Sequence, residues 1–168
     1  MVVKLYLANA FDRVKNEFLF QVMCRFGFSP EFINCVKACI SSPWIAPLVN
    51  GRVVGIFQAS RGLWQGCPLS PLIYSIQASM LSFQLDHFHR HQGLLGLKIA
   101  RGVKDINHVQ FIDDTIFLSG ASNIIARKFK HEMDLYKAAS RSKINLRKSH
   151  IYKWNVSPRD MASISRIL

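Results

Sequence analysis

The first third of the chain begins with strand-like and then helix-like spacing of apolar residues. Residues 2–7 are apolar and β-branched, which predicts a buried strand. Apolar residues then recur at helical spacing over 18–26, and Asp12 or Asn16 is the expected cap of that helix. The chain is therefore predicted to open with a strand that leads into a helix.

A second helix and a hairpin are predicted next. Ser29 is a favoured N-cap, and the proline after it suits the first position of a helix over 30–41. Residues 45–58 consist of two apolar runs around Asn50-Gly51. This dipeptide is the strongest short-range signal for a two-residue β-hairpin, because both turn positions need a positive φ.

The second half of the chain predicts two long helices and further strands. Residues 60–71 hold two glycines and two prolines, which is typical of a structured loop, and a long apolar helix is expected over 70–89. A second hairpin is predicted over 109–119, a basic amphipathic helix over 122–140 and a strand over 149–154. This order of elements predicts an α+β fold, in which helices pack on one face of an antiparallel sheet.

Composition narrows the function. The 168 residues are 49% hydrophobic and 19% charged, which excludes general disorder and fits one domain. Lys and Arg number 22 against 10 Asp and Glu, and the net charge of +12 favours polyanionic partners such as nucleic acid or an anionic membrane surface. No signal peptide and no run near the ~18 apolar residues of a membrane span is present, so we expect an intracellular protein of cytoplasm or nucleus, without membrane insertion. The four cysteines lack a CxxC pair and are expected to be buried small side chains.

Because acids are scarce, the adjacent pair Asp113 and Asp114 is the most informative candidate for chemistry. The two carboxylates lie between apolar strands and repel each other unless cations or hydrogen bonds compensate them. A solvated turn is one interpretation, since Asp is a favoured turn residue. A divalent-metal site is the other, since hard carboxylate oxygens suit Mg²⁺ together with substrate phosphates.

Five segments of the chain resemble, in order, those of reverse transcriptases. The Asn50-Gly51 hairpin is one, and the others are 4–14 (KLYLANAFDRV) like motif A, 61–71 (RGLWQGCPLSP) like motif B, 111–114 (FIDD) like motif C and 143–149 (KINLRKS) like motif D. The residues of these segments are most similar to those of polymerases from plant-type non-LTR (long interspersed type) retrotransposons. We interpret residues 1–168 as a single, partial polymerase palm domain, with fingers and thumb largely missing.

The resemblance implies a catalytic activity with cofactors and partners. It implies an RNA-directed DNA polymerase, a nucleotidyltransferase that uses two Mg²⁺ (or Mn²⁺) ions and acts on RNA template, DNA primer and dNTP. A motif A aspartate and the motif C hairpin bind the metals in this family, so Asp113 and Asp114 are the implied catalytic and metal-binding residues.

The same resemblance implies the contacts to nucleotide and template. Phe11 would pack under the sugar and exclude a 2′-hydroxyl, and a plain core aromatic is the alternative for this residue. Gln65 and Gly66 would approach template and incoming nucleotide. Lys148, or alternatively Lys143, would lie near the phosphates.

One position departs from the family pattern. In D-x-x-x-A-[FY]-D the first acid is the metal ligand, and this position is Tyr6. Asp12 is the second acid, six residues further on, and at ~3.3 Å per residue a strand does not bring it to the same place. A phenol with a pKa of about 10 stays neutral and does not replace a carboxylate. We expect weakened metal binding and little or no polymerase activity, that is, a pseudoenzyme. The alternatives are a non-catalytic basic nucleic-acid-binding remnant and an unselected retroelement fragment.

Two further clusters have alternative interpretations. His87 and His91 lie four residues apart on one helix face, as zinc ligands can, but no Cys or acid pair at ligand spacing completes the set, and the polar end of a helix is the other interpretation. The basic residues over 127–141 form either a solvated helix face or a contact to phosphates.

Overall fold

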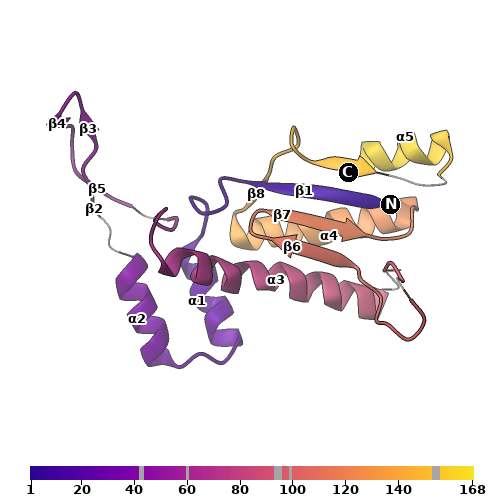
Figure 1. The fold of residues 1–168 in the computed structure, drawn as a ribbon, viewed down its shortest axis with the longest axis horizontal. Helices are drawn as coiled ribbons and strands as arrows, with labels where there is room; N and C mark the ends of the chain where they lie inside the picture. Colours follow the sequence, from indigo (N-terminus) through magenta and orange to yellow (C-terminus); the bar gives the residue numbers. More distant parts are fainter. Residues whose placement is uncertain (42–43, 60, 93–95, 99, 153–155) are drawn as a thin grey trace. The chain divides into compact units, whose positions relative to one another are not determined.

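The computed structural model describes residues 1–41, 44–59, 61–92, 96–98, 100–152 and 156–168. The chain forms two compact units, the first made of Met1–Ala10 with Ala78–Leu168 and the second of Phe11–Gln77. Helix α3 contributes to both. In chain order the elements of Figure 1 are β1 (Val2–Ala8), α1 (Asn16–Arg25), α2 (Pro30–Ile40), β2 (Trp44–Ile45), β3 (Leu48–Val49), β4 (Arg52–Val53), β5 (Phe57–Gln58), α3 (Leu69–Gln92), β6 (His108–Phe111), β7 (Asp114–Leu118), α4 (Asn123–Ser140), β8 (Lys143–Ile144), β9 (His150–Tyr152) and α5 (Pro158–Ile167).

Strand β1 lies at the centre of the antiparallel sheet of the first unit (Figure 1). Along one edge it pairs with β7, from Val2 opposite Leu118 to Tyr6 opposite Asp114. Along its other edge it pairs with β9 near its start and with β8 near its end. Strand β6 continues the sheet beyond β7. The predicted α+β fold with an antiparallel sheet is confirmed.

One face of this sheet is buried against a helix. Every second residue of β1 from Val3 to Leu7 is buried, because successive side chains of a strand point to opposite faces. On β7, Phe117 is fully buried and stacks on Phe129 of α4, with ring centroids 4.0 Å apart. Helix α4 therefore covers this face, and Tyr6 lies on the other face of the strand.

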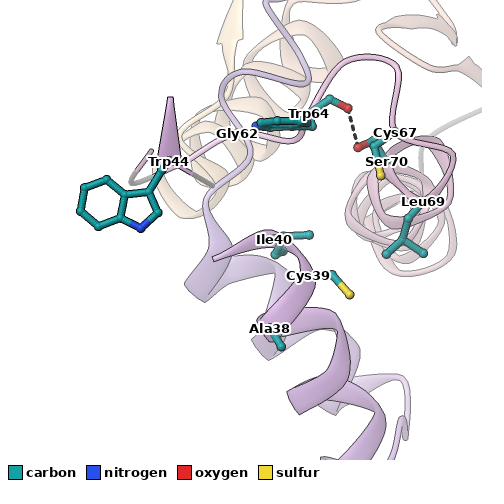
Figure 2. Close-up of a pocket in the computed structure, with 9 residues that line it drawn as sticks. All are labelled: Ala38, Cys39, Ile40, Trp44, Gly62, Trp64, Cys67, Leu69 and Ser70. Carbon is teal, nitrogen blue, oxygen red and sulfur yellow. Dashed lines mark hydrogen bonds between the residues drawn. The ribbon is translucent and has the colours of Figure 1, made fainter. Parts of the chain in front are cut away.

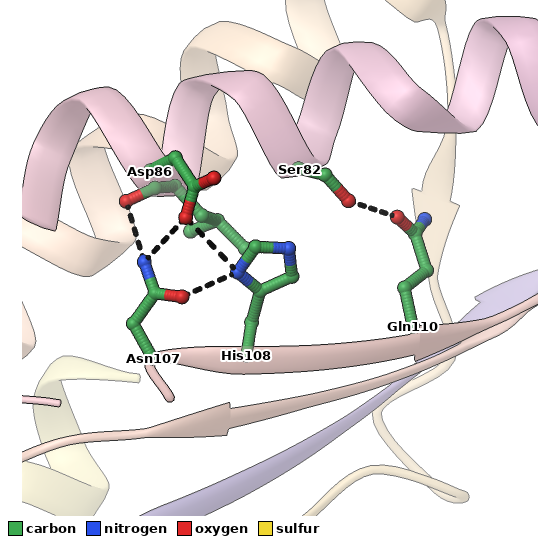
Figure 3. A network of polar contacts seen from close by, with 6 residues as sticks. Ser82, Asp86, Asn107, His108 and Gln110 are labelled. Carbon is green, nitrogen blue, oxygen red and sulfur yellow. Dashed lines mark hydrogen bonds and ion pairs between the residues drawn. The ribbon is translucent and has the colours of Figure 1, made fainter. Parts of the chain in front are cut away.

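Polar contacts connect α3 to β6 and its preceding residue in the first unit (Figure 3). The Asn107 amide nitrogen donates to Asp86 Oδ1 at 3.1 Å, and Ser82 Oγ donates to Gln110 Oε1 at 2.8 Å. His108 Nδ1 lies 2.8 Å from Asn107 Oδ1 and 3.9 Å from Asp86 Oδ1. Burial lowers the pKa of His108 below its ordinary value, so the imidazole is held neutral. These contacts position the strand that leads to the candidate carboxylates.

The predicted Asn50-Gly51 hairpin is present in the second unit. Asn50 has a φ of 52° and Gly51 a φ of 77°, as a type I′ turn requires. The ladder has two separate parts, because β3 pairs with β4 beside the turn and β2 pairs with β5 further from it. Apart from half-buried Ile45, the large apolar side chains along these four strands are exposed.

Helix starts agree with the prediction in two cases and differ in one. The hydroxyls of Ser29 and Ser122 accept hydrogen bonds from backbone N–H groups in the first turns of α2 and α4, as expected for N-caps. Helix α1, in contrast, has Lys15 as its N-cap, with no side-chain hydrogen bond. The expected cap at Asp12 or Asn16 is wrong, and Asp12 instead accepts a hydrogen bond from a distant loop.

Two elements near the C-terminus were not predicted. Strand β8 is only two residues long, too short for a periodic signal. Helix α5 does carry local signals, because Ser157 caps it and Pro158 occupies its first position. The predicted strand over 149–154 is confirmed as β9 at 150–152, and residues 153–154 lie outside the described residues.

The prediction of buried cysteines is wrong for three of the four. All four thiols are free. Cys24, Cys35 and Cys39 are nevertheless exposed, and Cys67 is half-buried. Their helices α1 and α2 bury only a narrow stripe of apolar side chains, and the cysteines lie outside it.

Candidate functional site

The candidate carboxylates lie at the bend of the β6–β7 hairpin. Phe111 pairs with Asp114, so that Ile112 and Asp113 form the turn between the strands. Ile112 has a φ of 50°, a left-handed conformation that β-branched residues rarely adopt, because the side chain crowds the following carbonyl. The turn that presents Asp113 is therefore strained.

Strand β1 places Tyr6 beside this turn. Tyr6 is opposite Asp114 in the β1–β7 register, and the Leu7 N–H donates to the Asp113 carbonyl at 2.8 Å. A hydrogen bond from the Tyr6 hydroxyl to the Asp113 carboxylate, together with the negative charge of that carboxylate, raises the pKa of Tyr6 above its ordinary value. The phenol thus keeps its proton at neutral pH, and this proton occupies an oxygen of Asp113.

Two lysines lie against the same group of side chains. Lys4 Nζ is 3.2 Å from Asp114 Oδ2, while Asp114 Oδ1 is buried and has no hydrogen-bond partner among the described residues. Lys148 Nζ lies 4.5 Å from the centroid of the Tyr6 ring, within the range of a cation–π contact. The Tyr6 N–H donates to Ser149 Oγ at 3.1 Å, which holds the segment carrying Lys148 beside β1.

In the second unit, the loop before α3 runs beside the turn that follows β1. The Gly62 N–H donates to the Val14 carbonyl and the Leu63 N–H to the Phe11 carbonyl, both at 2.9 Å. Gly62 has a φ of 88°, and a Cβ there would lie 3.0 Å from the Asp12 carbonyl oxygen, so this close approach requires glycine. A side chain of the loop also contacts this turn: Gln65 Nε2 donates a hydrogen bond to Asp12 Oδ1 at 3.2 Å.

A cavity of about 550 Å³ opens over this loop. Its lining includes Phe11, Trp64, Gln65 and Gly66. The Phe11 ring stacks on Tyr74 of α3, with centroids 4.9 Å apart, so Phe11 both packs on a helix and faces the cavity. The three residues expected to approach nucleotide and template thus line one cavity.

Comparison with known proteins identifies the family. The profile of reverse transcriptases (RNA-dependent DNA polymerases) matches residues 1–159. The chain belongs to the reverse transcriptase family. Its fold is similar to that of apo telomerase from Candida tropicalis, truncated from its C-terminal domain, with a TM-score of 0.65 and 14% identity over 94% of this chain and 31% of that one.

This reverse transcriptase domain is related to proteins of non-LTR retrotransposons. It is 28% identical over 142 residues to the transposon TX1 uncharacterized 149 kDa protein of Xenopus laevis, which covers 84% of this chain and 10% of that protein. It is 28% identical over 85 residues to the retrovirus-related Pol polyprotein of the type-1 retrotransposable element R2 of Popillia japonica, covering 51% of this chain and 14% of the polyprotein. An uncharacterized mitochondrial protein of Arabidopsis thaliana is 35% identical over 68 residues, covering 40% of this chain and 56% of that protein. The domain therefore spans between about a tenth and just over half of the length of these relatives.

Membership of this family generally implies Mg²⁺, and the residues present do not fit a two-metal centre. Asp113 is engaged by a neutral phenol and Asp114 by an ammonium group, and Tyr6, at the position where the resemblance leads us to expect a third carboxylate, carries no anionic oxygen. Among the described residues, no group of three or more His, Cys, Asp or Glu side chains is placed to hold a metal ion. The second oxygen of Asp114, Oδ1, is buried and has no hydrogen-bond partner among the described residues.

The site residues expected from the sequence divide between the two units. The first unit contains Tyr6, Asp113, Asp114 and Lys148, at and around the β6–β7 turn. The second unit contains Phe11, Gln65 and Gly66, which line the cavity over the loop before α3. Lys143, the alternative to Lys148, pairs with Ala8 in the sheet. Lys4 was overlooked, although its position two residues before Tyr6 on a strand places both on one face.

The histidine pair and the basic residues, for which the sequence left two interpretations each, lie on helices α3 and α4. The rings of His87 and His91 lie 4.4 Å apart by centroid on α3, and no third ligand joins them among the described residues. On the basic helix α4, Arg127 and Lys130 are exposed. None of the helices, over the part of the chain that the structure describes, has the length and apolar character to cross a membrane.

Proposed function

We propose that this domain is the palm of a plant-type non-LTR retroelement reverse transcriptase that binds nucleic acid but has little or no polymerase activity. The observation that carries the proposal is the hydrogen bond between Tyr6 and Asp113 at the position of the motif A aspartate. In this assignment motif A spans residues 4–14, motif B 61–71, motif C 111–114 and motif D 143–149.

The loss of catalysis follows from the chemistry of two-metal nucleotidyl transfer. Two bound metal ions would supply activation of the primer 3′-hydroxyl and charge neutralisation of the triphosphate, and several carboxylate oxygens at fixed positions would have to hold them. A protonated Tyr6 supplies no anionic oxygen, and its hydroxyl donates a hydrogen bond to the Asp113 carboxylate. Removing one member of a catalytic unit of this kind lowers turnover by orders of magnitude.

Binding of nucleic acid does not need the metals. The net charge is +12, and exposed Lys148 lies over the Tyr6 ring, where we assign it to phosphate. The cavity lined by Phe11, Gln65 and Gly66 is assigned to template and incoming nucleotide, where an aromatic ring and a backbone without a side chain allow close approach.

Primer extension tests the catalytic half of the proposal. On an RNA template with a DNA primer, dNTPs and Mg²⁺ or Mn²⁺, we expect no product from the unchanged chain. Tyr6→Asp is expected to be necessary for any extension, though not sufficient. Robust extension by the unchanged chain, abolished by Asp113→Ala, would show that Tyr6 does not prevent catalysis.

Affinity across salt tests the binding half. Fluorescence anisotropy with a single-stranded RNA is expected to show log Kd rising linearly with log salt, with a slope of several phosphates. Lys148→Ala should reduce that slope by about 1, whereas Lys37→Ala on α2 should leave it unchanged. An affinity that does not depend on salt would contradict this assignment.

A further inference from the structure

A second cavity of about 320 Å³ lies between the end of α2 and the start of α3, within the second unit (Figure 2). Its walls are mostly apolar or aromatic, and it holds two thiols. The lining residues are Ala38, Cys39, Ile40, Trp44, Gly62, Trp64, Cys67, Leu69 and Ser70. Cys39 and Cys67 are the only titratable side chains among them.

Cys67 occupies a special position at the edge of this cavity. It lies two residues before Leu69, where the 24-residue helix α3 begins, so that helical N–H groups point toward its sulfur. The Ser70 N–H donates to the Cys67 carbonyl at 3.1 Å, and Ser70 Oγ donates to the Trp64 carbonyl at 2.6 Å, which fixes the loop. The hydrogen bond from the Leu69 N–H is the main cause that lowers the pKa of the Cys67 thiol, against the opposing effect of desolvation.

The other cysteines lack this combination. Cys39 shares the cavity but lies in the last turn of α2, at the negative end of a helix dipole. Cys24 and Cys35 are exposed on helix surfaces and do not line this cavity. Of the four thiols, only that of Cys67 lies both at a helix N-terminus and in the lining of an apolar cavity.

We propose that Cys67 is a covalent modification site for apolar soft electrophiles, whose hydrophobic part is held in the cavity between Trp64 and Ile40. The reactive class is an activated alkene such as an α,β-unsaturated carbonyl compound. The Cys67 thiolate donates an electron pair to the β-carbon and forms a C–S bond. The π electrons move through the α-carbon to the carbonyl oxygen, and the enolate then takes a proton from water at the α-carbon.

Modification here has a consequence for the proposed nucleotide surface. Cys67, Trp64 and Ser70 also line the cavity that contains Phe11 and Gln65. An adduct on Cys67 therefore lies beside the residues assigned to template and nucleotide, a consequence that rests on the proposed function.

Labelling of the full chain with a small amount of N-phenylmaleimide tests the site. Peptide mapping by mass spectrometry should find the adduct on Cys67 first, about threefold or more faster than on Cys35, because a lower pKa raises the thiolate fraction more than it lowers nucleophilicity. N-phenylmaleimide should exceed N-methylmaleimide by a larger ratio at Cys67 than at Cys35, since the two reagents differ only in the apolar group.

Variants and fluorescence complete the test. Cys67→Ser should abolish the fast phase, while Cys35→Ser and Cys39→Ser should keep it. Adduct formation should also change the tryptophan emission through Trp44 and Trp64, which line the cavity. Labelling of Cys67 no faster than Cys35, or without preference for the phenyl reagent, would overturn the site.

A separate arm distinguishes this site from the proposed function. Pre-incubation with a single-stranded oligonucleotide should slow labelling of Cys67 and leave labelling of Cys35 unchanged. Fast, phenyl-selective labelling that the oligonucleotide does not slow supports the thiol site and contradicts the assignment of Gln65 and Gly66 to nucleic acid.

Discussion

Placing an aspartate at position 6, which we assign to the motif A carboxylate, should make the stability of this domain depend on divalent metal. In the β1–β7 register residue 6 lies opposite Asp114, and side chains at directly opposed positions have Cβ atoms about 5 Å apart. Two carboxylates at that separation repel each other by about 1 kcal/mol in water-like surroundings. For a chain of this length, 1 kcal/mol corresponds to roughly 2–4 °C in melting temperature.

These magnitudes give distinct expectations for three proteins in EDTA and in Mg²⁺ or Mn²⁺. Tyr6→Asp should melt several degrees below the unchanged chain in EDTA, because it adds repulsion and loses the hydrogen bond to Asp113. A metal at a hundred times its Kd stabilises the folded state by about 2.7 kcal/mol, so the same variant should gain roughly 5–10 °C. The unchanged chain should gain almost nothing, and neither should Tyr6→Asp combined with Asp113→Asn.

Differential scanning fluorimetry across metal concentration measures this directly. The decisive comparison is between the unchanged chain and Tyr6→Asp at equal ionic strength, with Na⁺ replacing the divalent ion, because salt screens the Lys4 pair as well. An equal rise in melting temperature for both proteins would refute the reasoning. It would mean that Asp113 and Asp114 bind metal with the phenol in place.

Three further predictions concern the scaffold of the site. Ile112→Asn should stabilise the domain by about 0.5–1 kcal/mol in urea unfolding, because asparagine tolerates the left-handed turn, whereas Val109→Asn at an exposed strand position should not stabilise it. Gly62→Ala should cost about 1–3 kcal/mol and more than Gly51→Ala, since both glycines have positive φ but only Gly62 meets backbone atoms at 3.0 Å. The lowered pKa of His108, set by burial and Lys104 against Asp86, means that the unfolded state binds the proton more readily, so stability should fall as pH drops below about 6.5. His108→Gln should flatten that part of the pH profile, and an unchanged profile would show that another group causes it.

The elements with strong local signals were predictable, and those that depend on distant packing were not. Ser29 caps its helix as expected, and Asn50 takes the left-handed turn that its dipeptide predicts, because these preferences act between near neighbours. Asp12 does not cap α1, since the helix begins at Asn16 with Lys15 as its N-cap, and the Asp12 carboxylate instead accepts a hydrogen bond from Gln65, 53 positions away. Strand β8 exists only because β1 lies beside it.

The sequence alone led to the hypothesis that the motif A carboxylate is absent. Motif spacing identifies position 6, and a tyrosine at that position has no anionic oxygen at neutral pH whatever the fold. The adjacent acids Asp113 and Asp114 and the excess of lysine and arginine are likewise evident from the sequence. These are properties of residue types and of their order along the chain.

Only the tertiary structure decided which groups surround Tyr6. The pairing of β1 with β7 brings the Tyr6 hydroxyl to Asp113 and the Lys4 ammonium to Asp114, across more than 100 residues of chain. It likewise decided which thiol lies both at a helix N-terminus and in an apolar cavity. Strand register and helix ends depend on long-range packing, so the charge balance of the site and the reactivity of Cys67 emerge only when the chain folds.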